Sequence, residues 1–241
     1  MHETTVKEVL DILEKGAPKD GKSQLSDRRL YCQLLVFTGC RDSRTLAGQF
    51  SSSGLEGVIY ADVNDPQGVG VLLIAENPAD FVTRAREIFL KESFANLKFR
   101  PEFTLLGRTY SSGFEQDLED WLLKRPRRYA CNPETPWAIW YPLRRKPEFE
   151  LLSKEEQRKI LMEHSTIGRQ FGEAGYASDI RLACHGIDQH DNEFVIGLMG
   201  KELYPLSRLV QEMRKSQQTA KYIQSLGPFF VGHVIWQSPL R

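Results

Sequence analysis

A single histidine lies within the apolar stripe of a predicted amphipathic helix. Four positions recur at steps of three and four residues in LSKEEQRKILMEHSTIGRQF (152–171): Ile160, His164, Ile167 and Phe171. This spacing places them on one helix face. A buried imidazole must either find a hydrogen-bond partner or bind a ligand, and neutral imidazole is a common metal ligand. The helix pattern by itself leaves both roles open for His164.

A glutamine occupies a similar position in the last predicted helix. Its neighbours on the same stripe are apolar: Leu206, Leu209, Val210, Met213 and Ala220. A metal-bound imidazole usually donates its second N–H to an oxygen atom, and the Gln217 carbonyl can accept it. Gln217 could equally bond to the backbone or to water. The pattern therefore raises the hypothesis of a His164–Gln217 pair.

Two predicted strands carry polar groups that are candidates for chemistry. In WAIWYPL, which begins at Trp137, alternation places Tyr141 on the same face as Trp137. In DIRLAC, Asp179 and Arg181 share one face and the apolar residues take the other. Because the apolar face belongs to the core, the two charged side chains either face solvent or line a cavity.

Three cations directly follow the first of these strands: Arg144, Arg145 and Lys146. An arginine can hold a carboxylate through two parallel hydrogen bonds. The same run is also consistent with a solvated turn. Both interpretations stay open from the residues alone.

The chain contains a weak internal duplication. Segments that start at Phe81 and Leu206 align at an offset of 125 residues, and each reads as a helix, a turn and a strand that ends at a glycine. With the preceding strands, each half has the order strand, helix, hairpin, helix, strand, which is a ferredoxin-like α+β unit. We therefore predict an N-terminal helix and linker, a first half, a connecting linker and a second half. Their bounds are 1–27, 28–120, 121–134 and 135–241.

The composition excludes several classes of protein. The 241 residues include 32 basic and 32 acidic side chains, so no overall charge favours nucleic acid or an anionic membrane. The four cysteines are scattered, which disfavours a zinc site or a disulfide framework and fits a reducing compartment. No stretch is long and apolar enough to span a bilayer, and the N-terminal residues lack a signal-like apolar core. We expect a cytoplasmic protein.

Four stretches of the second half resemble a known family when taken together: WYPLRRKPEFELLSKEEQRKILMEH, EHSTIGRQF, LVQEMRKSQQTAKY and LGPFFVGH. They are similar, in order and spacing, to motifs of the chlorite dismutase-like haem proteins, and most of all to the coproheme decarboxylases. The resemblance implies an α+β fold in which two ferredoxin-like halves form a dimeric α+β barrel within one chain. It also implies haem in the C-terminal half and a homo-oligomer, commonly a pentamer.

The resemblance also implies roles for individual residues. His164 matches the proximal iron ligand, and Tyr141 matches the tyrosine that decarboxylases oxidise to a radical. The implied reaction is the peroxide-dependent oxidative decarboxylation of iron coproporphyrin III to haem b, in which the porphyrin is both substrate and cofactor. The cations at residues 144–146 then become candidate contacts of the porphyrin propionates.

Two positions depart from the family pattern. Asp179 stands at the distal position, where chlorite dismutases have arginine and many decarboxylases have glutamine. A carboxylate there would repel chlorite, although Arg181 could substitute, and Asp179 could instead act as a base toward peroxide. Gln217 stands where the family often has glutamate, which predicts weaker electron donation by the proximal histidine and a higher iron reduction potential.

Three alternatives to decarboxylation remain at this stage. The first is a chlorite dismutase-type haem enzyme, which Asp179 disfavours. The second is a non-catalytic haem- or porphyrin-binding protein, which the changed pocket positions favour. The third is an α+β barrel of another purpose in which His164 is an ordinary core residue.

Overall fold

The computed structural model describes residues 10–240. It begins with a β-hairpin of strands β1 (Glu14–Lys19) and β2 (Lys22–Ser26). The predicted N-terminal helix over residues 1–16 is not found where the chain is described, and residues 1–9 lie outside that part. The hairpin forms because Asp20 and Gly21 both adopt positive φ angles, as a tight two-residue turn requires. The expected linker up to residue 27 is therefore an antiparallel ribbon.

Two runs of elements follow, with the same order of strand, helix, two strands, helical segment and two strands. The first run contains β3 (Tyr31–Thr38), α1 (Ser43–Ser51), β4 (Glu56–Asp62), β5 (Val69–Ala75), α2 (Ala79–Val82), α3 (Arg84–Phe89), α4 (Glu92–Ala95), β6 (Lys98–Phe99) and β7 (Leu105–Arg108). The second contains β8 (Trp137–Arg145), α6 (Lys154–Glu173), β9 (Ser178–Ala183), β10 (Phe194–Gly200), α7 (Leu203–Met213), β11 (Ile223–Leu226) and β12 (Phe230–Gln237). A π-helical turn (Asp120–Lys124) and α5 (Arg125–Ala130) connect the two runs.

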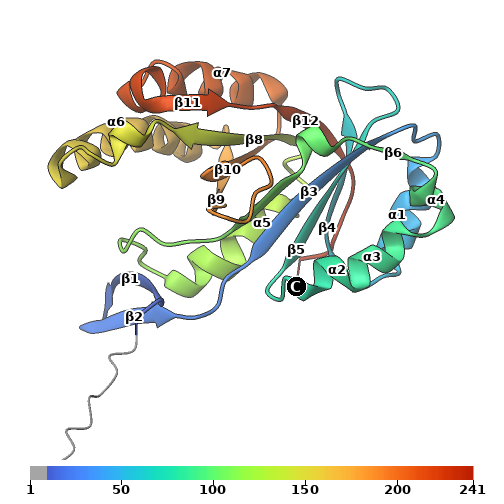
Figure 1. Cartoon of the computed structure of the whole chain (residues 1–241), viewed down its shortest axis with the longest axis horizontal. Helices are drawn as coiled ribbons and strands as arrows, with labels where there is room; N and C mark the ends of the chain where they lie inside the picture. The colour runs from blue at the N-terminus through green and yellow to red at the C-terminus, as the bar shows by residue number, and fades with distance from the viewer. Residues whose placement is uncertain (1–9, 241) are drawn as a thin grey trace, which may run out of the picture.

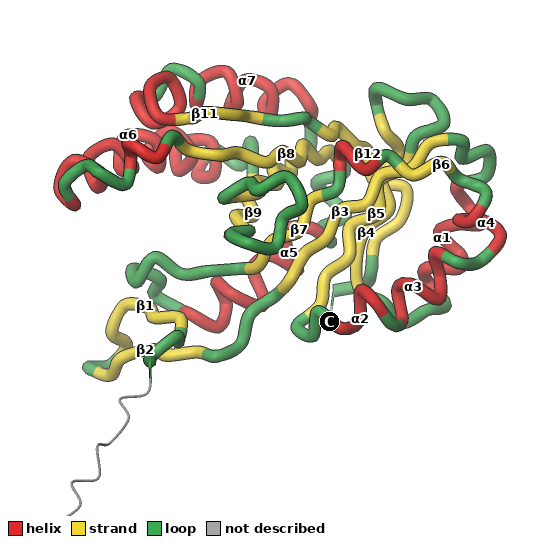
Figure 2. The backbone as a smooth tube through the Cα atoms, viewed as in Figure 1, coloured by secondary structure: helices red, strands yellow, loops and turns green. Residues whose placement is uncertain are grey.

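Neighbouring strands of the large sheet all pair antiparallel. The order of the strands across the sheet is β10-β9-β7-β3-β5-β4-β12-β8-β11. Strand β10 pairs with β8 as well as with β9, so the series of pairings returns to its start. The tube view shows the strands grouped in the middle of the molecule, with helices on two sides (Figure 2). The fold is thus a mixed α+β fold built on an antiparallel sheet.

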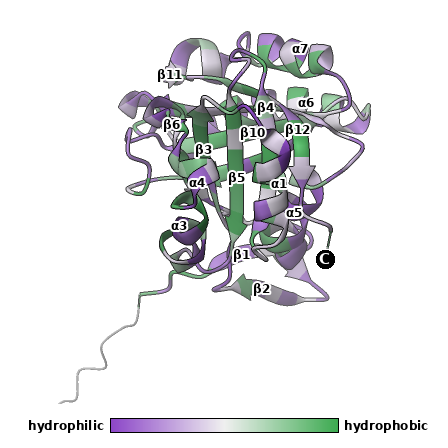
Figure 3. Ribbon diagram, turned by 90° about the vertical axis from the view of Figure 1, so that its right-hand side faces the viewer, coloured by the Kyte–Doolittle hydropathy of each residue, from purple (hydrophilic) through white to green (hydrophobic). Residues whose placement is uncertain are grey.

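Helices cover the outer faces of the two runs. In Figure 1, α6 and α7 lie over the β8–β11 side, and α1 to α4 lie beside β4 and β5. Apolar side chains of α1, α3 and α4 pack on β4 and β5. Strand β5 is buried along nearly its whole length and reads as a continuous apolar run, as a strand covered on both faces should (Figure 3).

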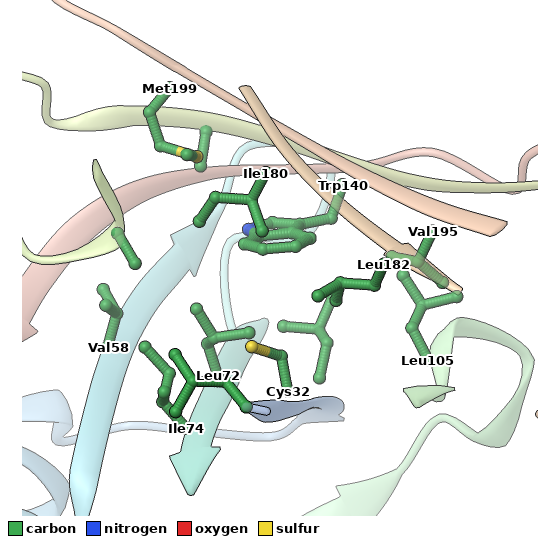
Figure 4. Close-up of a cluster of buried hydrophobic side chains, with 14 of the residues drawn as sticks. Cys32, Val58, Leu72, Ile74, Leu105, Trp140, Ile180, Leu182, Val195 and Met199 are labelled. Carbon is green, nitrogen blue, oxygen red and sulfur yellow. The ribbon is translucent and has the colours of Figure 1, made fainter. Parts of the chain in front are cut away.

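A second apolar cluster lies between the two runs of strands. Trp140 of β8 and Ile180 of β9 meet Cys32, Leu72 and other residues of the first run there (Figure 4). Strand alternation then directs Tyr141, the next residue of β8, to the opposite face, toward α7. The two faces of β8 therefore differ: Trp140 lies in the interior cluster, and Tyr141 lies on the outer face.

No helix within residues 10–240 combines the length and the apolar character needed to cross a bilayer.

Candidate active site

Helix α6 positions His164 on the outer face of the second run. A capping box fixes the helix start: the Ser153 hydroxyl accepts from the Glu156 backbone N–H, and the Glu156 carboxylate accepts from the Ser153 backbone N–H. Apolar residues of α6, among them Ile167 and Phe171, pack in the cluster between α7 and the sheet. His164 lies on this helix face and is half-buried.

The hydrogen bonds around His164 define its tautomer. Nδ1 of His164 lies 3.1 Å from Oγ of Ser216, which is itself fully buried. Ser216 Oγ donates its own proton to the Met213 carbonyl at 2.8 Å, so it accepts from Nδ1–H of the imidazole. Nε2 then carries the lone pair and has no hydrogen-bond partner among residues 10–240.

Burial also keeps this imidazole neutral. Burial, and after it the positive charge of Arg181, lowers the pKa of His164 from 6.5 to about 4. At neutral pH, His164 therefore offers an unprotonated, unpaired Nε2, which is the form that binds a metal ion.

Ser216, and not Gln217, is the partner of His164. The Gln217 side chain is exposed, and its backbone N–H lies 3.3 Å from a carboxylate oxygen of Glu163. Helix α7 ends at Met213, and the chain then enters a π-helical turn over residues 218–222, so the α-helical spacing that predicted Gln217 no longer holds. The expected His164–Gln217 hydrogen bond is replaced by the contact with Ser216.

Tyr141 lies on the sheet face against which α6 and α7 pack. Its ring stacks on Phe229 with centroids 4.7 Å apart, and it is almost completely buried. Its hydroxyl forms no hydrogen bond with the described residues, while burial and then the negative charge of Asp179 raise its pKa. The phenol is therefore protonated at neutral pH, and its O–H is free to meet a ligand.

The strand register places the charged pair beside Tyr141. Ile196 of β10 pairs with Tyr141 on one side and with Arg181 on the other, so Tyr141 and Arg181 project from the same face, two strands apart. This corresponds to about 10 Å between their backbones. The prediction that Asp179 and Arg181 occupy the non-core face agrees with this register.

Asp179 does not present a free carboxylate. Arg125 Nη2 donates to Asp179 Oδ1 at 2.9 Å, and Arg181 Nε lies 2.8 Å from Oδ2. The three groups together carry one net positive charge. The repulsion of anions expected from a lone carboxylate at residue 179 is thus offset by two guanidinium groups.

The three cations after β8 have different environments. Arg145 shares the face of Tyr141, and its guanidinium is paired with Glu193 and Glu150 at 3.1 and 3.0 Å. Arg144 points to the other face and donates to the His190 carbonyl at 2.6 Å. The remaining cation, at residue 146, is exposed. The structure therefore brings only one of these three, Arg145, to the face of Tyr141.

Two further residues reach the site without having been predicted. The guanidinium of Arg214 lies 5.9 Å from the Phe229 ring, and its charge lowers the pKa of Tyr141. Tyr110 contacts the Phe194 ring at 5.6 Å and lies within the fields of Arg181 and Arg145. Arg214 lies in the VQEMR stretch, one of the motifs that carry the family resemblance, and that motif could have identified it. Tyr110 gave no sequence signal because its position depends on how the connecting segment crosses the sheet.

The arrangement fits an iron porphyrin. Within the described part of the chain, no three His, Cys, Asp or Glu side chains gather closely enough to hold a metal ion. A metal at His164 Nε2 therefore takes its other ligands from a bound molecule, and a porphyrin supplies four nitrogens. Tyr141 and Phe229 belong to the apolar cluster between the sheet and α7, so a macrocycle held at His164 would meet apolar side chains there.

The protein has a mixed α+β fold and a candidate site with a single neutral histidine. The chlorite dismutase family model matches residues 68–235, so the chain belongs to the chlorite dismutase family. The family predicted from the second-half motifs is thereby confirmed.

Comparison with curated proteins points to one branch of this family. The chain is 30% identical over 195 residues to a coproheme decarboxylase of Oceanobacillus iheyensis, covering 71% of this chain and 74% of that protein. It is also 30% identical over 121 residues to a coproheme decarboxylase of Staphylococcus carnosus, covering 48% of this chain and 47% of that protein.

Solved structures agree on the fold. A haem-binding protein from Thermus thermophilus has a TM-score of 0.67 at 16% identity, over 86% of this chain and 91% of its own. A chlorite dismutase variant from Candidatus Nitrospira defluvii has a TM-score of 0.65 at 15% identity, over 89% and 94%. At these identities the likeness concerns the fold alone.

Proposed function

We propose that this protein is a haem-dependent oxidoreductase that uses peroxide to decarboxylate iron coproporphyrin III to haem b. The observation that carries the proposal is the neutral His164, whose Nδ1 is engaged by Ser216 and whose Nε2 is free, on the same side of the sheet as the unpaired hydroxyl of Tyr141. The relatedness to coproheme decarboxylases at 30% identity supports the choice of substrate.

Each residue has a defined task in this proposal. His164 Nε2 would hold the iron, and the bound iron porphyrin would supply one-electron oxidation chemistry with peroxide. Tyr141, whose protonated phenol has no internal partner, would lose its O–H hydrogen atom to the oxidising system of iron porphyrin and peroxide, and its oxygen would then take a hydrogen atom from the β-carbon of a propionate. Removal of one further electron from the propionate by the same system would release carbon dioxide and leave a vinyl group, so each decarboxylation would consume one peroxide, which is reduced to two water molecules.

The cations around Tyr141 would hold the propionates. Arg145 and Arg214 are on its side of the sheet and can donate to carboxylates. Arg145 would exchange its exposed partner Glu150 for a propionate. Arg144 and Lys146, which were predicted for the same role, are not assigned to it, because Arg144 points to the other face and Lys146 is exposed.

We further propose that the two runs are ferredoxin-like halves that close into one dimeric α+β barrel, as the double pairing of β10 suggests. The assembly would be a homo-oligomer, most simply a pentamer, that acts in the cytoplasm with the porphyrin and hydrogen peroxide as its small-molecule partners.

The proposal is tested with the purified protein. Iron coproporphyrin III should produce a shifted Soret band, and added peroxide should lower the porphyrin mass by two carboxyl groups in steps. His164→Ala should abolish the band shift. Tyr141→Phe should retain binding and stop the mass loss. Tyr60→Phe is the matched control, because Tyr60 is a buried tyrosine with an unpaired hydroxyl in the interior cluster. Binding without turnover would instead indicate a porphyrin-binding protein.

One observation favours a second candidate, chlorite degradation. The net positive charge of Arg125, Asp179 and Arg181 would hold an anionic oxidant at the open side of the site. Oxygen release from chlorite by the haem-loaded protein, without decarboxylation of coproporphyrin, would support this reading over the first.

A further inference from the structure

The segment between the two halves, expected to be only a linker, enters the site. The Trp121 indole Nε1–H donates to the Tyr110 carbonyl at 2.8 Å, which fixes the ring. The guanidinium groups of Arg125 and Arg181 lie 4.2 and 5.0 Å from the centroid of this same ring. Two arginines that share the carboxylate of Asp179 thus also share one aromatic side chain.

Arg125 is the firmly held member of this group. Its side chain is 20% exposed, and its guanidinium contacts the rings of both Trp121 and Tyr129 while donating to Asp179. A planar guanidinium loses little freedom when it stacks and donates in this way. Arg125 is therefore the anchor of the group.

Arg181 is the member that remains available. Its side chain is 41% exposed, and its Nε lies 2.8 Å from Asp179 Oδ2. Its two Nη groups make no hydrogen bond within residues 10–240. The strand register places Arg181 on the same face of the sheet as Tyr141, the face on which α6 and α7 pack, and its Nη groups can donate to a small anion there.

Asp179 consequently serves as a bridge. Each of its oxygens is paired with a different guanidinium group, so the carboxylate links Arg125 to Arg181. Without this carboxylate, the two arginines would repel each other.

We propose that Trp121 and Arg125 are positioning residues of the site, which act through Asp179 to hold the Arg181 guanidinium where it binds a small anion on the sheet face that it shares with Tyr141. The inference rests on the proposed function for its ligand. The positioning itself is a property of the protein without porphyrin.

The first test uses the porphyrin-free protein. Nitrogen-15 relaxation of the arginine Nε–H groups should show Arg181 ordered in the wild type and mobile in Arg125→Met. Arg128→Met is the matched control, since Arg128 lies on the same helix but pairs with Asp120 at 2.9 and 3.2 Å. An Arg181 signal that is mobile in the wild type, or equally ordered in Arg125→Met, would overturn the proposal whether or not the protein binds porphyrin.

The second test uses the iron porphyrin-loaded protein and compares azide with neutral imidazole as ligands. Arg125→Met should weaken azide binding by about tenfold and leave imidazole binding unchanged. A general structural defect would weaken both ligands, and that result would count against a positioning role.

Arg125→Lys separates positioning from charge alone. Lysine retains the local net charge but lacks the planar guanidinium that stacks on Trp121 and donates to Asp179. Arg125→Lys should therefore weaken azide binding as much as Arg125→Met. Azide affinity equal to that of the wild type would refute the positioning role. Failure of the protein to take up iron porphyrin would refute the proposed function, and the relaxation measurement would still decide the role of Arg125.

Discussion

The titration of His164 gives a quantitative test of the site that needs no bound porphyrin. Burial lowers its pKa from 6.5 to about 4 in the folded protein, while the unfolded chain retains the ordinary value. Above pH 6.5 both states are neutral at this residue, and the full stability is present. As the pH falls, the unfolded chain takes up a proton that the folded protein refuses until about pH 4, so folding is progressively weakened.

The magnitude follows from the difference between the two pKa values. It corresponds to about 3 kcal/mol when complete, and about 2 kcal/mol of this is lost between pH 7 and pH 5. We expect His164→Asn to lack this loss, because asparagine cannot titrate but can still donate to Ser216. The free energy of unfolding would be measured by urea denaturation of both proteins at each pH.

The comparison with His164→Asn removes the contributions of other titrating groups. His185→Asn, which replaces an exposed histidine, serves as the matched control and should follow the wild type. If wild type and His164→Asn lose the same stability between pH 7 and pH 5, the imidazole is not buried in its neutral form. The assignment of a free Nε2 at neutral pH would then fail.

Two other substitutions test the surroundings of this site. Ser216→Ala removes the acceptor of the His164 Nδ1–H and should weaken iron porphyrin binding, measured by Soret titration, by about tenfold or more, whereas Gln217→Ala should have little effect. Equal losses of porphyrin affinity in Ser216→Ala and Gln217→Ala would contradict the assignment of Ser216 as the partner of His164. Gly197→Ala would place a Cβ 2.5 Å from the Trp140 ring and should lower the free energy of unfolding by about 1 to 3 kcal/mol. Gly48→Ala is its control, because no atom lies within 4 Å of that added Cβ and the change should not destabilise α1.

Local patterns in the sequence were sufficient for the parts of the site that depend on one element. The steps of three and four residues placed His164 on the packed face of α6, and strand alternation placed Asp179 and Arg181 on the face away from the core. Alternation from Tyr141 could also have separated Arg145 from Arg144, since residues an even number of positions apart share a face. The family motifs identified the family because they lie within single helices and strands.

Long-range contacts decided what the sequence left open or mispredicted. Ser216 replaces Gln217 beside His164 because α7 ends early and a π-helical turn changes the spacing, which helical periodicity cannot anticipate. The N-terminal segment, where described, forms a hairpin because a tight turn forms at residues 20–21 and because Glu14 is bound by Arg108 and Ser111, almost one hundred residues away.

The sequence by itself determined the fold family, the iron-binding histidine candidate and the faces on which the polar residues lie. Periodicity and capping fix these features within one helix or strand. Only the tertiary structure decided which side chains meet. It brought Arg125 from the connecting segment against Asp179 of β9, 54 positions along the chain, and so turned an isolated carboxylate into a group with net positive charge. Such contacts depend on the packing of distant elements, which no local pattern records.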